Sequence, residues 1–326
     1  DLQAGRRDDL PEAASIEVRT VHCTSCGAVI ELTGANYATE CPFCASPVVL
    51  DTGSQRLIKP QALVPFQLTE GQARTALTGW MGSLWFAPNR LLEYARKGRA
   101  MNGVYVPFWT FDAATRSSYT GQRGEAYYET RTVTVNVNGR REQREERVRK
   151  IRWYPASGRV ARDFDDVLVM GSASLPQRLG NELTPWDLSA LHPYSPDFLA
   201  GFQAEGYTVP LADADRQAKD RMAAVIHEDV RRDIGGDEQR VNSVDTDWSA
   251  ETFKHILLPV WMAAYKYNGR SYRFLVNGQT GEVQGERPWS VWKIGFTVLA
   301  VVVVALVAAY LNDPEMFGGA VPDWLD

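Results

Sequence analysis

An uncharged run near the carboxyl end constrains this chain more than any other feature. Residues 294–311 read IGFTVLAVVVVALVAAYL, eighteen residues without a charge. As a helix they would extend roughly 27 Å, close to the thickness of the hydrocarbon core of a bilayer. A buried strand is the alternative because valine favours β-structure, but eighteen residues exceed the usual strand length. With Trp289 and Trp292 before the run and Tyr310 closing it, the sequence predicts one transmembrane helix over residues 289–311.

The charges on either side of this helix predict its orientation. Arg287 and Lys293 precede the uncharged run, whereas residues 312–326 contain only acidic charges. Because basic residues favour the cytoplasmic side, we expect a single-pass protein of the cell or inner membrane. Its amino-terminal body would then lie in the cytoplasm and its short acidic tail on the opposite side.

All four cysteines lie near the amino end, in two closely spaced pairs. Cys23, Cys26, Cys41 and Cys44 give the spacing C-x2-C-x14-C-x2-C. This pattern is typical of a zinc ribbon, which we expect over residues 16–50 within an amino-terminal region of residues 1–58. Four thiolate ligands leave no open position, so one Zn²⁺ would be structural and not catalytic. Disulfides are the alternative, but they are rare in the reducing cytoplasm.

His22 adjoins the first cysteine and is a possible competing ligand. With four cysteines available, we interpret it as a surface neighbour of the site and not as a ligand.

Residues 59–288 combine helical and strand patterns, which predicts an α+β body rich in strands. Thr69 and Gln72 form a capping box at the start of a helix that continues to residue 84, and a second short helix is expected over residues 90–96. Asp213 is expected to cap a longer helix over residues 214–234, whose apolar stripe consists of Ala218, Met222, Val225, Ile226, Val230 and Ile234.

The strands of the body are predicted as hairpins. Residues 127–137 and 140–154 flank an Asn-Gly turn, and residues 255–267 and 270–277 flank a second one. An aromatic, β-branched strand is expected over residues 103–112. The irregular, Pro- and Gly-rich segment 185–210 is expected to connect the parts.

A short motif occurs twice, 152 residues apart. Residues 104–109 read VYVPFW and residues 256–261 read ILLPVW. The repetition predicts a duplicated strand motif, with two related halves (residues 100–170 and 250–288) joined by a helical segment; the alternative is a chance match. With a duplication, Trp109 and Trp261 are expected to be core or interface anchors.

The strand expected over residues 140–154 carries many charges of both signs. Mixed signs on a hairpin favour a solvated face with cross-strand ion pairs. A surface for anionic lipid headgroups or nucleic acid is the sharper alternative, and the expected membrane helix favours lipid.

No catalytic pattern is recognisable in the sequence. It has no nucleotide-binding glycine loop and no metalloprotease or nucleophile motif, and His22, His192, His227 and His255 are scattered. Two groups of aspartates, at positions 163, 165 and 166 and at positions 245 and 247, are interpreted as solvated loops and not as cation sites. The net charge of -5 argues against a protein built to hold nucleic acid. Because no catalytic pattern is recognisable, we expect a protein that is not an enzyme.

Three parts of the chain resemble a bacterial family: the cysteine pattern, residues 193–207 (PYSPDFLAGFQAEGY) and residues 257–293. The VNGQTG and GERP segments within residues 276–288 are the most specific part of this resemblance. Members of the family are zinc-ribbon proteins with a carboxy-terminal membrane helix, described as TFIIB-type zinc-ribbon or "primosomal protein N′-like". The chain lacks a Walker motif, so a helicase function is rejected. The resemblance implies one zinc ion and a membrane adaptor whose partner is a flotillin-like (SPFH) or phage-shock-protein-A-like protein.

The sequence as a whole predicts a zinc ribbon that projects from a cytoplasmic α+β body held at the membrane by one helix. The expected function is to recruit or scaffold a partner protein. Two alternatives remain: a membrane-tethered nucleic-acid-binding ribbon, and an enzyme acting on lipid or envelope precursors.

Overall fold

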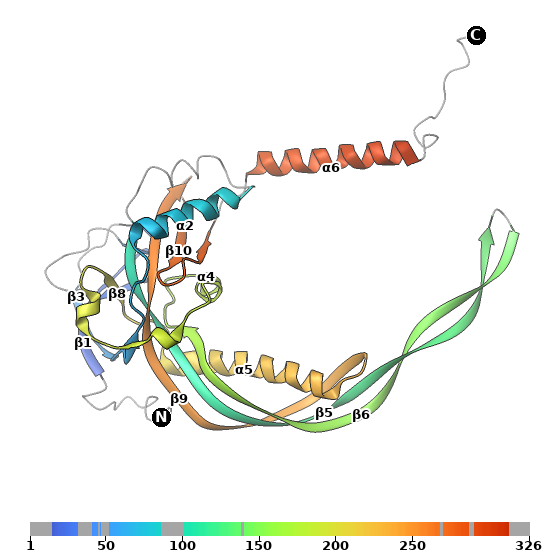
Figure 1. Cartoon of the computed structure of the whole chain (residues 1–326), viewed down its shortest axis with the longest axis horizontal. Helices are drawn as coiled ribbons and strands as arrows, with labels where there is room; N and C mark the ends of the chain where they lie inside the picture. Colours follow the sequence, from blue (N-terminus) through green and yellow to red (C-terminus); the bar gives the residue numbers. More distant parts are fainter. Residues whose placement is uncertain are drawn as a thin grey trace, which may run out of the picture.

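The computed structural model in Figure 1 has the mixed α+β character that the sequence predicts, with most residues in strands. The structure describes residues 15–31, 41–44, 46, 52–85, 101–137, 140–267, 270–286 and 290–312. The short helix predicted over residues 90–96 and the acidic tail lie outside the described residues.

One eleven-stranded sheet organises the chain, with the main order β11-β10-β9-β5-β8-β2-β1-β3. β6 pairs with β5, and β4 pairs with β7 and β9, off this path. The strands are β1 (Ser15–His22), β2 (Val29–Glu31), β3 (Thr52–Ile58), β4 (Ala62–Leu63), β5 (Asn102–Val137), β6 (Arg140–Met170), β7 (His192–Pro193), β8 (Gln203–Glu205), β9 (Glu238–Tyr267), β10 (Arg270–Asn277) and β11 (Val283–Gly285). The helices are α2 (Glu70–Ser83), α4 (Gln177–Glu182), α5 (Leu211–Ile234) and α6 (Val291–Asn312), with short 3-10 turns at Leu188–Ala190 and Pro196–Leu199.

Three strands are far longer than the sequence predicts. β5 has 36 residues, β6 has 31 and β9 has 30, and together they form the long curved sheet in Figure 1. The segments 103–112 and 127–137 are parts of one strand, because β6 and β9 pair with the polar residues between them. The aspartates at 163–166 and at 245 and 247 lie in β6 and β9, so their interpretation as loops is wrong.

Helix α5 lies on the concave side of this curved sheet (Figure 1). Met222, Ile226 and Val230 are buried there as predicted, but Val225 is 40% exposed and does not belong to the buried stripe. The helix begins at Leu211 after Pro210, earlier than predicted, and Asp213 lies in its first turn instead of capping it.

Helix α2 has the predicted capping box. The backbone N–H of Gln72 donates to Thr69 Oγ1 (3.4 Å), and the N–H of Thr69 donates to Gln72 Oε1 (2.9 Å). Leu77 and Met81 bury its apolar face, so this prediction is confirmed.

The two copies of the repeated motif are antiparallel neighbours. Val104 is opposite Val260, and Phe108 is opposite Ile256. Trp109 is fully buried and Trp261 is 8% exposed, which confirms both as core residues. Pairing does not establish a common origin, so the duplication itself stays a prediction.

Helix α6 extends away from the body (Figure 1). Its window Trp292–Ala309 is long and apolar enough to cross a membrane, and none of it is buried in the protein. An apolar helix without protein cover needs a lipid or protein environment. The predicted orientation is not tested by the fold.

Candidate metal centre

Two short turns bring the four cysteines together. The first turn follows β1: the N–H of Cys23 donates to Ala28 O (2.9 Å), and the N–H of Gly27 donates to Cys23 O (2.8 Å). Gly27 has a φ of +76°, which favours glycine at this tight corner. In the second turn, the N–H of Cys41 donates to Ser46 O (2.8 Å). Each turn therefore presents two thiols to the same point.

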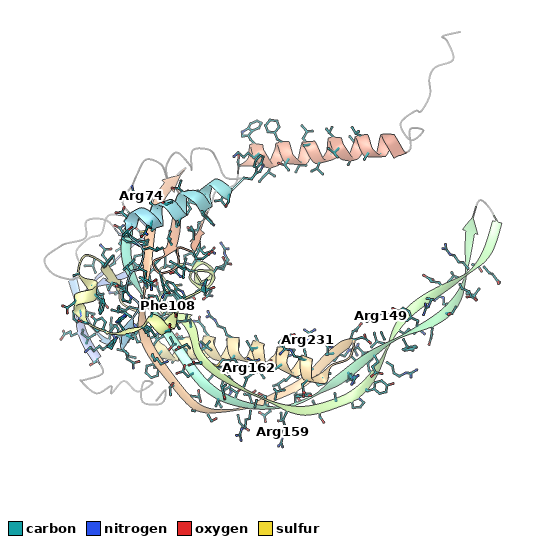
Figure 2. All side chains as sticks on the ribbon, viewed as in Figure 1. Arg74, Phe108, Arg149, Arg159, Arg162 and Arg231 are labelled. Atoms are coloured by element: carbon teal, nitrogen blue, oxygen red, sulfur yellow. The ribbon has the colours of Figure 1, made fainter. Side chains whose placement is uncertain are left out.

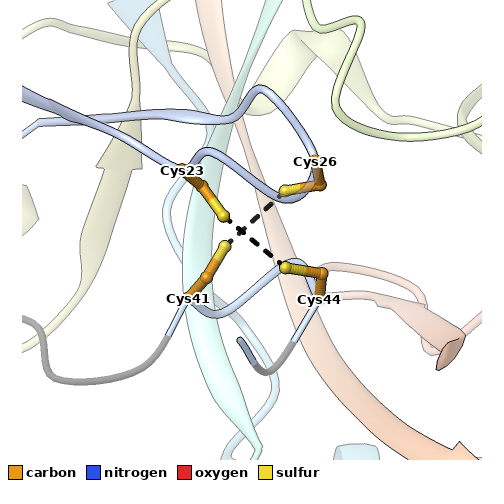
Figure 3. A group of neighbouring side chains, drawn as sticks. All are labelled: Cys23, Cys26, Cys41 and Cys44. Atoms are coloured by element: carbon orange, nitrogen blue, oxygen red, sulfur yellow. Dashed lines mark hydrogen bonds between the residues drawn. The ribbon is translucent and has the colours of Figure 1, made fainter. Parts of the chain in front are cut away.

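The sulfur positions fit a tetrahedral zinc ion. Cys23 Sγ lies 3.6 Å from Cys44 Sγ, and Cys26 Sγ lies 3.8 Å from Cys41 Sγ, so each contact joins the two turns (Figure 3). All four sulfurs lie within 4.8 Å of one another. A tetrahedron with Zn–S bonds of about 2.3 Å has sulfur–sulfur edges of about 3.8 Å, whereas a disulfide requires about 2.05 Å. The four cysteines are free thiols, and their geometry is compatible with one zinc ion.

The thiols perturb one another because they are crowded and partly buried. The contact with Cys41 lowers the pKa of Cys26 to about 5. The same contact raises the pKa of Cys41, and burial raises the pKa of Cys44. Such a group of thiols binds a divalent cation by releasing protons. With four protein ligands, the ion would stabilise the two turns without an open coordination position.

The cysteine site packs into the body instead of projecting from it, which corrects the predicted arrangement. Cys23, Cys41 and Cys44 belong to the same buried cluster as Val106 and Met170 of the long strands. Strand β2 also pairs with β8 of the body. The apolar residues beside the cysteines, such as Ala28 and Ile30, explain this docking, because an isolated ribbon would expose them to water.

A buried carboxyl group near the cysteines was missed from the sequence. Glu205 on β8 is opposite Ile30 of β2 and is 1% exposed. Ser172 Oγ (2.8 Å) and Ser174 Oγ (2.5 Å) donate to its Oε1, while Oε2 is buried and has no hydrogen-bond partner among the described residues. Burial is the main reason that the pKa of Glu205 is raised to about 8; the hydrogen bonds from Ser174 and Ser172 oppose the rise, and the charges of Cys26 and Glu31 add to it. No sequence motif identifies such a buried carboxyl group, because its burial depends on the contact between β2 and β8.

The histidines are not brought together. His22, His192 and His227 are exposed, and His255 is buried. His255 Nδ1 lies 2.7 Å from Ile58 O, and burial lowers the pKa of this ring to about 4. His22 is not among the residues whose ligand atoms cluster with the four sulfurs, in agreement with its interpretation as a surface neighbour.

One aspartate group does converge. Asp112, Asp165 and Asp166 place carboxylate oxygens within 4.8 Å of one another. The ammonium group of Lys254 already lies there, 2.8 Å from Asp166 Oδ1 and 3.5 Å from Asp112 Oδ2. A resident lysine supplies the positive charge that a metal would bring, so this group is an ion-pair network.

Comparisons with known proteins give a distant relative of unknown function. The chain is 26% identical over 264 residues to "Uncharacterized protein YdjG" of Bacillus subtilis (strain 168), covering 77% of this chain and 72% of that protein. No protein-family model and no solved structure matches the chain. The resemblance to membrane-anchored zinc-ribbon proteins therefore rests on the clustered cysteines and the apolar helix, and membership of that family stays a prediction.

Proposed function

We propose that this protein is a membrane-anchored zinc-ribbon adaptor. Its four cysteines hold one structural Zn²⁺, α6 spans the membrane, and the sheet body recruits a partner protein at the cytoplasmic face. By family resemblance, the partner is a flotillin-like or phage-shock-protein-A-like protein.

The observation that carries this proposal is the contrast between the two ends of the chain. The four thiols lie in or against the buried core and converge on one point, which suits a structural ion that takes all four of its ligands from the protein. Helix α6 is apolar and has no protein cover, which suits an anchor. An anchored body raises the local concentration of whatever it binds at the membrane surface.

Membrane fractionation with affinity purification in mild detergent tests the proposal. The full chain should sediment with membranes and retain its partner, and a variant lacking residues 289–326 should move both to the soluble fraction. In a matched control, an unrelated single-span helix replaces residues 290–312 and should restore membrane recovery of both proteins, because the helix serves only as an anchor.

The proposal fails if the partner stays at the membrane when this protein is absent. It also fails if salt-sensitive nucleic acid, and no protein, is recovered with the full chain, since that result would assign the nucleic-acid-binding alternative.

A further inference from the structure

The β5–β6 hairpin continues well beyond the rest of the sheet. β9 last pairs with β5 at Gly124, opposite Glu238, whereas β5 and β6 stay paired as far as Val137 and Arg140. We define the arm as residues 125–137 of β5 and 140–152 of β6. At about 3.3 Å per residue it extends roughly 43 Å, as the free hairpin in Figure 1. Among the described residues, no strand pairs with either outer edge of the arm.

The direction of the backbone groups along the arm follows from two contacts. The N–H of Ala126 donates to Asp237 Oδ2 (2.8 Å), so it faces the edge that β9 leaves open. Backbone direction alternates along a strand, so the N–H and C=O groups of the even-numbered residues 128–134 face this edge too. Pro155 agrees with this assignment. It is opposite Gln122, at a position where β6 needs no N–H because the group would point outward.

The two edges of the arm differ in chemistry. On β6, seven of the ten residues 143–152 are charged, and Pro155 follows them; such features protect an edge strand against pairing. Figure 2 shows one of these charged residues, Arg149. On β5, residues 126–134 contain only Glu129 and Arg131 as charges, and Thr130, Thr132, Val133 and Thr134 are β-branched. Only the β6 edge is therefore protected, and the β5 edge retains the composition of a strand that pairs.

We propose that the β5 edge of the arm pairs antiparallel with the same edge of a second copy of this chain. Outward-facing residues meet in any symmetric register centred on a residue, and near the middle of the paired segment the twofold axis passes near residue 130, 131 or 132. An axis at Arg131 opposes two guanidinium groups, and an axis at Thr130 places residue 136 of the second copy opposite Gly124, where Glu238 already lies. An axis at Thr132 avoids both problems.

The register centred on Thr132 sets Thr130 opposite Thr134 of the second copy and Arg131 opposite Val133 of the second copy. No like charges are opposed among these residues, and threonine pairs are favourable across strands. The β6 edge is less suited to self-pairing, because every symmetric register centred from Glu145 to Arg149 opposes two like charges. The charge pattern therefore favours the β5 edge over the centre of the β6 edge, and it permits a second copy of this chain as the partner.

Proline substitutions at opposite positions of the arm test this pairing. Thr132 is opposite Glu145, and the N–H groups of both residues face outward, so proline at either site spares the hydrogen bonds between β5 and β6. The full chain in mild detergent should be a dimer by light scattering and sedimentation. Thr132→Pro should weaken the dimer by at least about tenfold, because each copy loses a backbone hydrogen bond, whereas Glu145→Pro should leave it unchanged. The double variant Thr130→Lys with Thr132→Lys should also give monomers without removing any backbone donor.

The proposal would be overturned by a monomer at every concentration or by equal weakening of the dimer by the two prolines. It would also be overturned by a dimer that all three variants leave intact, because the contact would then lie elsewhere, for example in α6. Hydrogen exchange provides an independent measurement. The outward-facing amides of Tyr128, Thr130 and Thr134 should be protected in the dimer and exchange in Thr132→Pro, whereas the odd-numbered amides, which face β6, should be protected in both. Protection that arises only when vesicles containing phosphatidylglycerol are added to a monomer would assign the arm to lipid headgroups and overturn pairing between copies.

Discussion

Replacing the carboxyl group of Glu205 by an amide should remove a pH-dependent loss of stability. The pKa of Glu205 is about 8 in the folded protein, raised from an ordinary value of 4.5 mainly by burial. Folding therefore favours the neutral acid. The stability associated with that neutral form is fully present below pH 4.5 and is lost as the pH rises through about 8.

The magnitude follows from the linkage between protonation and folding. Between the two pKa values, each pH unit costs about 1.4 kcal/mol of the free energy of unfolding. From pH 6.5 to pH 8 the loss is about 1.5 kcal/mol, because the slope falls near the folded pKa. Glu205 is 1% exposed, so solvent screens this effect little. For a chain of this size, the loss corresponds to a fall of roughly 3 °C in the unfolding temperature.

Thermal unfolding of the full chain and of Glu205→Gln, followed in detergent at pH 6.5 and pH 8, measures this difference. The wild-type unfolding temperature should fall more steeply with pH than that of the variant. Ser172 and Ser174 can still donate to the amide oxygen, so the variant should fold. Metal binding also depends on pH, and the charge of Cys26 acts on Glu205, so both proteins are compared with zinc in excess. Equal slopes for the two proteins would refute the assignment of a neutral buried acid.

Three further substitutions test the metal site and the packing. Cys41→Ser should reduce the zinc content from one ion per chain to almost none and cost on the order of 5 kcal/mol of stability; elemental analysis that still finds one ion would contradict the site. Trp109→Phe should cost about 3 kcal/mol in chemical denaturation, because it removes a fully buried indole and its 3.0 Å hydrogen bond to Val209 O. Gly121→Ala should cost about 3 kcal/mol, since its Cβ would lie 2.4 Å from a carbonyl oxygen of β9. The matched Gly79→Ala in α2, where a Cβ meets nothing within 4 Å, should stabilise the protein by about 0.5 kcal/mol; equal effects of the two alanines would contradict the close approach at Gly121.

The features that could be predicted from the sequence are those whose physics is local. The cysteine spacing predicts a metal site because two tight turns each present two thiols, whatever surrounds them. The uncharged run predicts a helix long enough to cross a bilayer from its length and hydropathy. The capping box at Thr69 and Gln72 needs only three residues of separation.

The length of the strands could not be predicted, because it depends on partners distant in the sequence. Residues 113–126 lack a strong strand pattern, yet β6 and β9 pair on either side of them and carry β5 through as one strand. Strands in most proteins are much shorter than eighteen residues. β5, β6 and β9 exceed this usual length because each forms backbone hydrogen bonds with a neighbouring strand of similar length.

The sequence by itself determined the four-thiol site, the apolar carboxy-terminal helix and the mixed α+β character, since each depends on spacing, length or periodicity within one segment. Only the tertiary structure decided that the cysteine site docks into the body, that Glu205 is buried, and that the pairing of β9 with β5 stops at Gly124 and leaves one edge of the arm open. These features arise where segments far apart in the chain pair or fail to pair, and a carboxylate or a strand edge has no marker in the sequence that tells whether another segment will cover it.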